Sequence, residues 1–339
     1  MNNIPRIIIH VGAPKTGSTY LQKRLRADPA HLRRNGIYVP VLPSVAQMAG
    51  NAKLLATVLS KRASLSFERI FPNIDVTRLR PTAIVSELLR DWRSDEEAIV
   101  LSAENFRPEH AGALRELLPT CRACVIVLFV RRQDQWIESY FNQLTKTADV
   151  AEDLSSFVTR LCDTQGERFC RPDWNAHYEA WRHAFGACNI VFYDEARSDL
   201  FSAFLSAAGL PIVPDLIEVP PAQVSLNIHD LAYLLALERP FSHADFVRRR
   251  AAGEQASKRL ASGVRSILGG AEHEKLRQRF EASNHNLLIA LGRANEPKLL
   301  QLTPSTRRCD LNEVYASDDY VRYRKLADEI FSAQPRGSV

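Results

Sequence analysis

Continuous runs of apolar residues mark the buried strands of this chain. Residues 6–11 read RIIIHV, 98–102 read AIVLS, 125–130 read VIVLFV and 189–193 read NIVFY. Such runs are typical of strands that are covered on both faces, as in a parallel sheet. The pattern therefore predicts a largely parallel sheet built from these segments.

Between the runs, apolar residues recur at intervals of three and four, as they do on one face of a helix. The clearest stripes lie in 82–92, 111–118, 136–144 and 198–208. Strands that alternate with helices predict an α/β fold, here a P-loop-like parallel β-sheet flanked by helices. From residue 225 to about 300 the pattern is helical, so we expect a mostly helical C-terminal third.

The proline-rich segment 211–221 reads as a loop or linker between these two parts. We expect residues 1–215 to form the α/β core and residues 216–339 to form a helical extension packed on it, within one continuous domain. The 339 residues, 45% of them hydrophobic, suffice for a large buried core.

The charge is mildly basic, with a formal net charge of +5. This suits anionic ligands but does not indicate a nucleic-acid partner. The chain shows no signal peptide, and its longest apolar run, 125–130, is far shorter than the 20 or so residues that cross a bilayer. We therefore expect a cytoplasmic protein without a transmembrane segment.

The six cysteines do not show the spacing of a zinc site. Cys121 and Cys124 form a CxxC, but no second CxxC or HxxxH accompanies it. We interpret the cysteines as free thiols, with a zinc or redox role of the CxxC as the less favoured alternative.

A glycine-bearing loop follows the first apolar run and precedes a helical stripe. Gly12–Thr19 reads GAPKTGST. Backbone N–H groups of such a loop, at a helix N-terminus, form a cradle for an oxyanion. In a nucleotide-triphosphate loop, GxxxxGK[ST], a lysine would stand where Ser18 is found, whereas here Lys15 lies inside the loop.

The second apolar run, 98–102, leads to Glu104 and not to the aspartate expected of a Walker-B strand. Together with the position of Lys15, this argues against ATP or GTP hydrolysis. A P-loop nucleotide kinase or GTP-binding switch stays open as the alternative, as does a non-catalytic nucleotide-binding protein of the same fold.

The stretch IIIHVGAPKTGSTYLQKRL, with its loop at Val11–Leu21, resembles the 5′-phosphosulfate loop of sulfotransferases that use 3′-phosphoadenosine 5′-phosphosulfate (PAPS), in particular their bacterial branch. VIVLFVRRQDQWIESYFNQ is similar to the second motif of that family, in which a serine follows an arginine by eight positions; here these are Arg131 and Ser139. A weaker similarity covers 174–211. The resemblance thus spans residues 6–211.

This resemblance implies transfer of a sulfuryl group from PAPS to an acceptor hydroxyl, with adenosine 3′,5′-bisphosphate as product and no metal required. Lys15 would stabilise charge on the leaving phosphate. Arg131 and Ser139 would bind the 3′-phosphate. The 5′-phosphate would be held by the backbone N–H and hydroxyl groups of Thr16, Gly17, Ser18 and Thr19.

An acceptor hydroxyl also needs a base, and family members place a histidine or glutamate after the strand that precedes the 3′-phosphate motif. Glu104 stands at that place in this chain. The alternative is that Glu104 caps the helix that begins near Pro108 or pairs with an arginine. We expect His10, inside an apolar run, to be structural and not the base.

The acceptor is not readable from the sequence. Bacterial members of the family are associated with sulfation of carbohydrates, lipids and small hydroxylated metabolites. We expect a carbohydrate, glycolipid or small metabolite, in a pocket shaped by 46–62 and by the helical segment from residue 225. Related sequences often carry a histidine in the stretch that here reads Gly50-Asn51-Ala52-Lys53, so acceptor choice is expected to differ.

Overall fold

The computed structural model describes residues 4–43, 50–61, 65–149, 152–163, 171–219, 226–237, 242–260, 266–305 and 308–334. The chain forms two compact units, each assembled from separate segments. The sheet unit comprises 1–132, 167–222 and 280–301, and the helical unit comprises 133–166, 223–279 and 302–339. These two units differ from the expected ranges 1–215 and 216–339. The expected division into a core and a helical extension stays a prediction.

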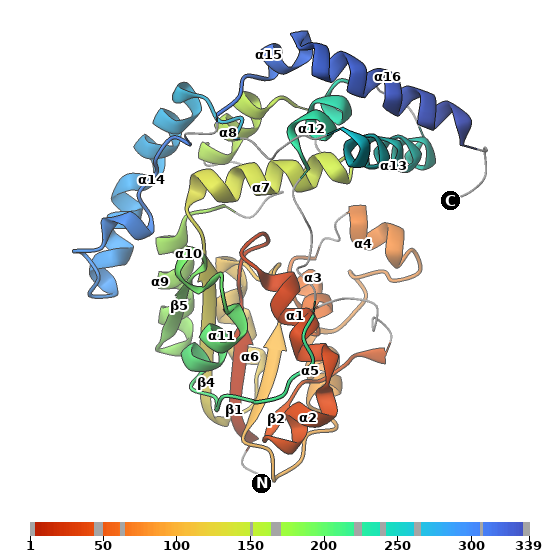
Figure 1. Cartoon of the computed structure of the whole chain (residues 1–339). Coiled ribbons are helices and arrows are strands. Elements are labelled where there is room, and N and C mark those ends of the chain that lie inside the picture. Colours follow the sequence, from red (N-terminus) through yellow and green to blue (C-terminus); the bar gives the residue numbers. More distant parts are fainter. Residues whose placement is uncertain are drawn as a thin grey trace. The chain divides into compact units, whose positions relative to one another are not determined.

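The sheet unit contains a five-stranded, wholly parallel sheet in the order β2-β3-β1-β4-β5 (Figure 1). The strands are β1 (Ile4–His10), β2 (Ile37–Tyr38), β3 (Ala98–Ser102), β4 (Cys121–Val130) and β5 (Cys188–Phe192). The expected α/β fold with a parallel sheet is confirmed. The short edge strand β2 was not predicted; its two residues begin the apolar stretch 37–42, which Pro40 interrupts.

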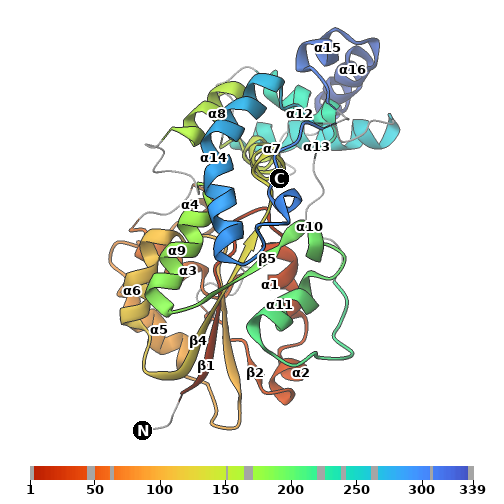
Figure 2. The same ribbon diagram turned by 90° about the vertical axis from the view of Figure 1, so that its left-hand side faces the viewer.

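Helices cover both faces of this sheet, as the edge-on view in Figure 2 shows. Helices α1 and α11 lie on one face, and α5, α6 and α9 lie on the other. The helices of the sheet unit are α1 (Ser18–Ala27), α2 (Pro29–Arg34), α3 (Lys53–Leu59), α4 (Leu65–Ile70), α5 (Pro81–Leu89), α6 (Ala111–Leu117), α9 (Trp174–Phe185), α10 (Tyr193–Ala196) and α11 (Leu200–Ala208).

The apolar runs of the inner strands β1 and β3 are buried on both faces. Ile7, Ile8 and Ile9 of the central strand β1 have no exposed surface. The helix expected at 198–208 begins at Leu200, because the Asp199 side chain accepts a hydrogen bond from Ser202 N and caps it.

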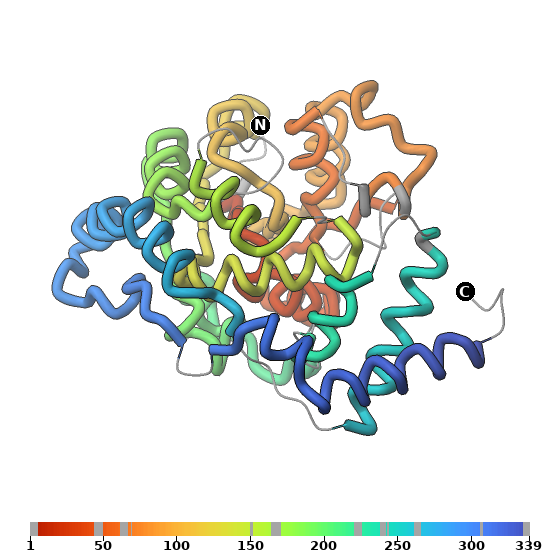
Figure 3. The backbone as a smooth tube through the Cα atoms, turned by 90° about the horizontal axis from the view of Figure 1, so that it is seen from above, coloured from red at the N-terminus to blue at the C-terminus, as the bar shows by residue number. Residues whose placement is uncertain are grey.

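The helical unit has no strand among its described elements. Its helices, seen from above in Figure 3, are α7 (Gln133–Lys146), α8 (Leu154–Cys162), α12 (Ile228–Leu235), α13 (His243–Arg259), α15 (Leu311–Ala316) and α16 (Asp318–Ala333). The division of the sequence between Arg279 and Phe280 falls within helix α14 (Gly270–Ala290). No helix in the described ranges combines the length and apolar character needed to cross a membrane.

Buried polar contacts hold α12, α13 and α16 together. The carboxylate of Asp230 on α12 accepts hydrogen bonds from Ser257 on α13 and Tyr323 on α16, and Asn227 also donates to it. The apolar side chains of the same helices surround this cluster. A buried carboxylate with several donors fixes the relative rotation of these three helices more tightly than apolar contacts alone.

Candidate functional site

The connection between β1 and α1 forms a tight loop at the carboxyl edge of the sheet. Lys15 has a φ of 67° and Gly17 a φ of 92°, both in the left-handed region. The hydroxyl groups of Thr16 and Ser18 both donate to the Ala13 carbonyl, at 2.7 and 3.0 Å. These two bonds close the loop on itself, and both hydroxyl-bearing residues are buried.

The backbone N–H groups of the loop remain available to a ligand. Within the described part of the chain, the N–H groups of Gly17, Ser18 and Thr19 have no protein acceptor, and the Thr19 hydroxyl has no partner. These groups stand at the N-terminus of the ten-residue helix α1, whose dipole favours negative charge there. The loop is therefore built to hold an anion.

Its position in the sheet supports the same conclusion. After β1, the chain forms β2 and β3 on one side of that strand. It then crosses over and forms β4 and β5 on the other side. Ligands of open α/β sheets bind at such a switch point, outside the carboxyl ends of the strands. Glu104 follows β3 and Arg131 follows β4, so both lie at this same edge.

A buried histidine forms the floor beneath the loop. His10 Nδ1 lies 2.9 Å from Ser102 Oγ, which also accepts a hydrogen bond from Gln22 Nε2 at 3.2 Å. Burial lowers the pKa of His10 to about 3, so the ring is neutral at ordinary pH. The burial of His10 and its contact with Ser102 agree with the structural role expected from its place inside an apolar run, which stays a prediction.

The position of the His10 ring also explains why the first residue of the loop is glycine. A Cβ placed on Gly12 would lie 2.3 Å from His10 Nε2. Gly12→Ala is therefore expected to lower the free energy of unfolding by about 2–3 kcal/mol, the usual cost of overpacking a rigid interior. Chemical denaturation measures this loss.

Gly112→Ala is the matched control, because nothing lies within 4 Å of the Cβ that it would add on α6. That variant should be at least as stable as the unaltered chain, since alanine favours a helix over glycine. Equal stability of the two variants would contradict the close packing of His10 against the loop.

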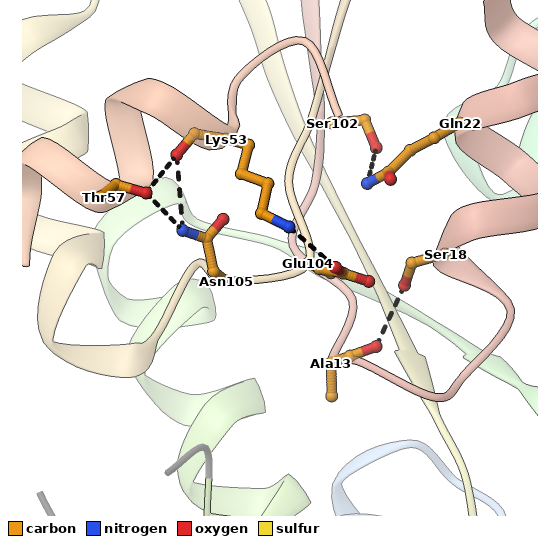
Figure 4. A network of polar contacts seen from close by, with 8 residues as sticks. All are labelled: Ala13, Ser18, Gln22, Lys53, Thr57, Ser102, Glu104 and Asn105. Atoms are coloured by element: carbon orange, nitrogen blue, oxygen red, sulfur yellow. Dashed lines mark hydrogen bonds and ion pairs between the residues drawn. The ribbon is translucent and has the colours of Figure 1, made fainter. Parts of the chain in front are cut away.

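Glu104 forms an ion pair with a lysine that the sequence did not single out. Lys53 Nζ lies 3.3 Å from Glu104 Oε1, and 32% and 23% of the two side chains are exposed. Figure 4 shows the two side chains pointing toward each other, at the same edge of the sheet as Ser18 of the loop. A ligand can therefore reach both groups.

Next to this pair, Asn105 fastens the segment after β3 to α3. Its Nδ2 donates to Thr57 Oγ1 at 3.0 Å and lies 3.4 Å from the Lys53 carbonyl oxygen (Figure 4). Neither the predicted cap of the helix near Pro108 nor an arginine partner is observed for Glu104 among the described residues. Its partner is Lys53.

The stretch Gly50–Lys53 is held by the edge of β3. Asn51 Oδ1 accepts from Ser102 N at 2.7 Å, and its Nδ2 donates to the Val100 carbonyl at 2.8 Å. The Asn51 amide thus continues the hydrogen bonding that β2 provides only opposite Ala98 and Ile99. A Cβ on Gly50 would lie 2.7 Å from the Ser102 carbonyl oxygen, so this close approach requires glycine.

Arg131 contacts the loop between β1 and α1 directly. Its Nη1 donates to the Lys15 carbonyl at 3.3 Å, and its guanidinium lies 4.8 Å from the centre of the Tyr193 ring. The Trp174 indole donates to the Arg131 carbonyl at 2.7 Å. Two elements distant in sequence thereby fix the arginine beside the loop.

Of the predicted residues, the structure brings Lys15–Thr19, Glu104 and Arg131 to one edge of the sheet unit. Ser139 is half-buried on α7, which belongs to the helical unit. Its joint role with Arg131 stays a prediction. Part of the segment 46–62, expected to shape the acceptor pocket, lies outside the described residues.

Sequence reasoning missed Lys53, Asn51 and Tyr193. The sequence signal near Asn51 and Lys53 is the stretch Gly50-Asn51-Ala52-Lys53, where related sequences often carry a histidine. A search of the described residues finds no group of three or more His, Cys, Asp or Glu side chains that would hold a metal ion.

The helical unit contains a cavity of its own, of about 710 Å³. Apolar side chains such as Leu235, Ile267 and Tyr315 line it together with the charged groups of Glu272 and Arg308. A cavity of this size and mixed lining suits a small organic molecule.

Comparison with known proteins adds one finding. No protein-family model and no curated protein matches the chain. Among solved structures, it is similar to a sulfotransferase from Alicyclobacillus acidocaldarius, with a TM-score of 0.50. The chain has the fold of that sulfotransferase. The likeness covers 85% of this chain and 96% of that protein, at 14% sequence identity.

Proposed function

We propose that this protein is a sulfotransferase that moves a sulfuryl group from PAPS to a hydroxyl group of an acceptor. The observation that carries the proposal is the loop after β1, in which Lys15 has a left-handed conformation and, within the described residues, the N–H groups of Gly17, Ser18 and Thr19 have no protein acceptor. Strained backbone at a ligand site costs about 1–3 kcal/mol and persists where function requires it. The shared fold is in keeping with the proposal.

On the donor side, Gly17, Ser18 and Thr19 would hold the 5′-phosphate by their N–H groups and by the Thr19 hydroxyl. The Thr16 and Ser18 hydroxyls already bond to Ala13, so they would act by shaping the loop. The Lys15 ammonium would stabilise the negative charge that gathers on the phosphate oxygen as the S–O bond breaks. Transfer of this kind depends mainly on in-line positioning and charge stabilisation, as phosphoryl transfer does.

On the acceptor side, Glu104 would take the proton of the attacking hydroxyl. It follows β3, the strand next to β1, and its side chain is partly exposed. Lys53 would keep the carboxylate oriented until the acceptor enters. The acceptor would be a carbohydrate, glycolipid or small hydroxylated metabolite.

The 3′-phosphate of the donor would bind to Arg131, with Ser139 as a further ligand. Calorimetry with adenosine 3′,5′-bisphosphate tests this: we expect binding by the unaltered chain and a loss of affinity of at least tenfold in Arg131→Ala, since an arginine–phosphate contact contributes about 1.5–3 kcal/mol. Arg122→Ala, at an exposed position early in β4, is the matched control and should bind normally.

The same titration with ATP and Mg²⁺ separates the rival functions. Binding of ATP–Mg²⁺ without binding of the bisphosphate would favour a kinase or NTPase and contradict the proposal. Binding of the bisphosphate without transfer from labelled PAPS to any member of a panel of glycosides, glycolipids and phenols would favour a non-catalytic binding protein.

A further inference from the structure

Two thiols are in contact at the start of β4, the opposite end of the strand from Arg131. Cys121 Sγ lies 3.0 Å from Cys124 Sγ, and both residues are half-buried. Among the described cysteines, no other two are bonded to each other. The CxxC that the proposed function leaves unused is therefore a paired dithiol.

The two thiols differ in acidity. The hydrogen bond from Cys124 lowers the pKa of Cys121 to about 7, with help from the Arg115 guanidinium and against the effect of burial. The same hydrogen bond, followed by burial, raises the pKa of Cys124. At pH 7, about half of Cys121 is therefore thiolate, and Cys124 is the thiol that donates to it. By contrast, burial alone raises the pKa of Cys188 to about 12.

We propose that Cys121 and Cys124 form a redox site that exchanges with small-molecule disulfides. The Cys121 thiolate attacks one sulfur of the disulfide, forms a mixed disulfide and expels one thiolate. Cys124 then loses its proton and attacks the Cys121 sulfur, which expels the second thiolate. One protein disulfide and two small thiols result: the proton of Cys124 ends on one released thiolate, and the other thiolate takes a proton from water.

Oxidation would change the sheet locally. Three residues of a straight strand span about 10 Å, so sulfurs 3.0 Å apart require the start of β4 to depart from a straight strand already. A disulfide needs Cα atoms still closer, about 4.4–6.8 Å apart. Closing the bond therefore bends the start of β4 and weakens the pairing of Cys121 with Ile4 of β1. Faster amide exchange at this end of the two strands is the expected sign.

The test uses the full-length reduced chain and oxidised glutathione at neutral pH, followed by acid quenching, alkylation and trypsin. Arg122 stands between the two cysteines, so trypsin cuts the backbone between them. A disulfide then links peptide 116–122 to peptide 123–131, and this linked pair is the expected product. Cys309→Ser is the matched control and should still form it. All variants carry Cys170→Ser in addition, because Cys170 lies outside the described residues.

Two variants separate the steps. Cys124→Ser should retain glutathione on Cys121, because no second thiol displaces it. Cys121→Ser should take up glutathione on Cys124 far more slowly than Cys124→Ser does on Cys121. Absence of the linked peptides, or alkylation of Cys121 no faster than that of Cys309 at pH 7, would overturn the proposal. None of these measurements depends on sulfuryl transfer, so the result stands apart from the proposed function.

Discussion

Lys15→Met is expected to lower the turnover number of sulfuryl transfer by about 10²–10³-fold, the usual cost of removing one preorganised group that stabilises transition-state charge. Methionine keeps the length of the side chain but removes the ammonium that would meet the leaving oxygen. Steady-state kinetics with labelled PAPS at saturating donor measures the change. Since the loop N–H groups remain, affinity for adenosine 3′,5′-bisphosphate should fall far less than turnover.

Two further variants separate the charge of Lys15 from its backbone conformation. Lys15→Gly removes the strain of a φ of 67° and also the ammonium. It should lose activity as Lys15→Met does, yet change the free energy of unfolding by less than about 1 kcal/mol, because relief of strain offsets the entropy that glycine loses. Lys23→Met, at an exposed position of α1, should be fully active. An unchanged turnover number in Lys15→Met would exclude the lysine from the chemistry.

Glu104→Gln is expected to reduce turnover by about 10²–10⁴-fold, the range that general base catalysis contributes. The amide oxygen can still accept from Lys53, so the local structure should persist while the basic oxygen is lost. The acceptor identified in the panel screen is the substrate for this comparison, and bisphosphate binding should be unaltered.

Glu109→Gln is the matched control, since Glu109 is exposed and contacts only Arg107 among the described ion pairs. It should keep full activity. If Glu104→Gln also kept full activity, the Lys53–Glu104 pair would be a structural ion pair and another group would be the base. Lower stability of Glu104→Gln with unchanged turnover would lead to the same conclusion.

Much of the fold follows from local sequence patterns. Near-continuous apolar runs predicted the strands β1, β3, β4 and β5, because strands buried on both faces are mostly apolar. The edge strand β5 departs from this pattern at the exposed Asn189. The place of the loop was also predictable, since Gly12–Thr19 stands between such a run and a helical stripe. The edge strand β2 was not predicted, because two residues show no periodicity.

The sequence alone placed Glu104 and Arg131 after strands and so at one edge of the sheet. It did not predict the ion pair of Glu104 with Lys53 or the hydrogen bond from Arg131 to the Lys15 carbonyl. Only the tertiary structure decided these contacts, because they join residues far apart in the chain through side-chain geometry. The same holds for Asn51, whose amide bonds to the edge of β3. Burial produces a periodic pattern of apolar residues in a sequence, whereas a single hydrogen bond between distant residues produces no pattern.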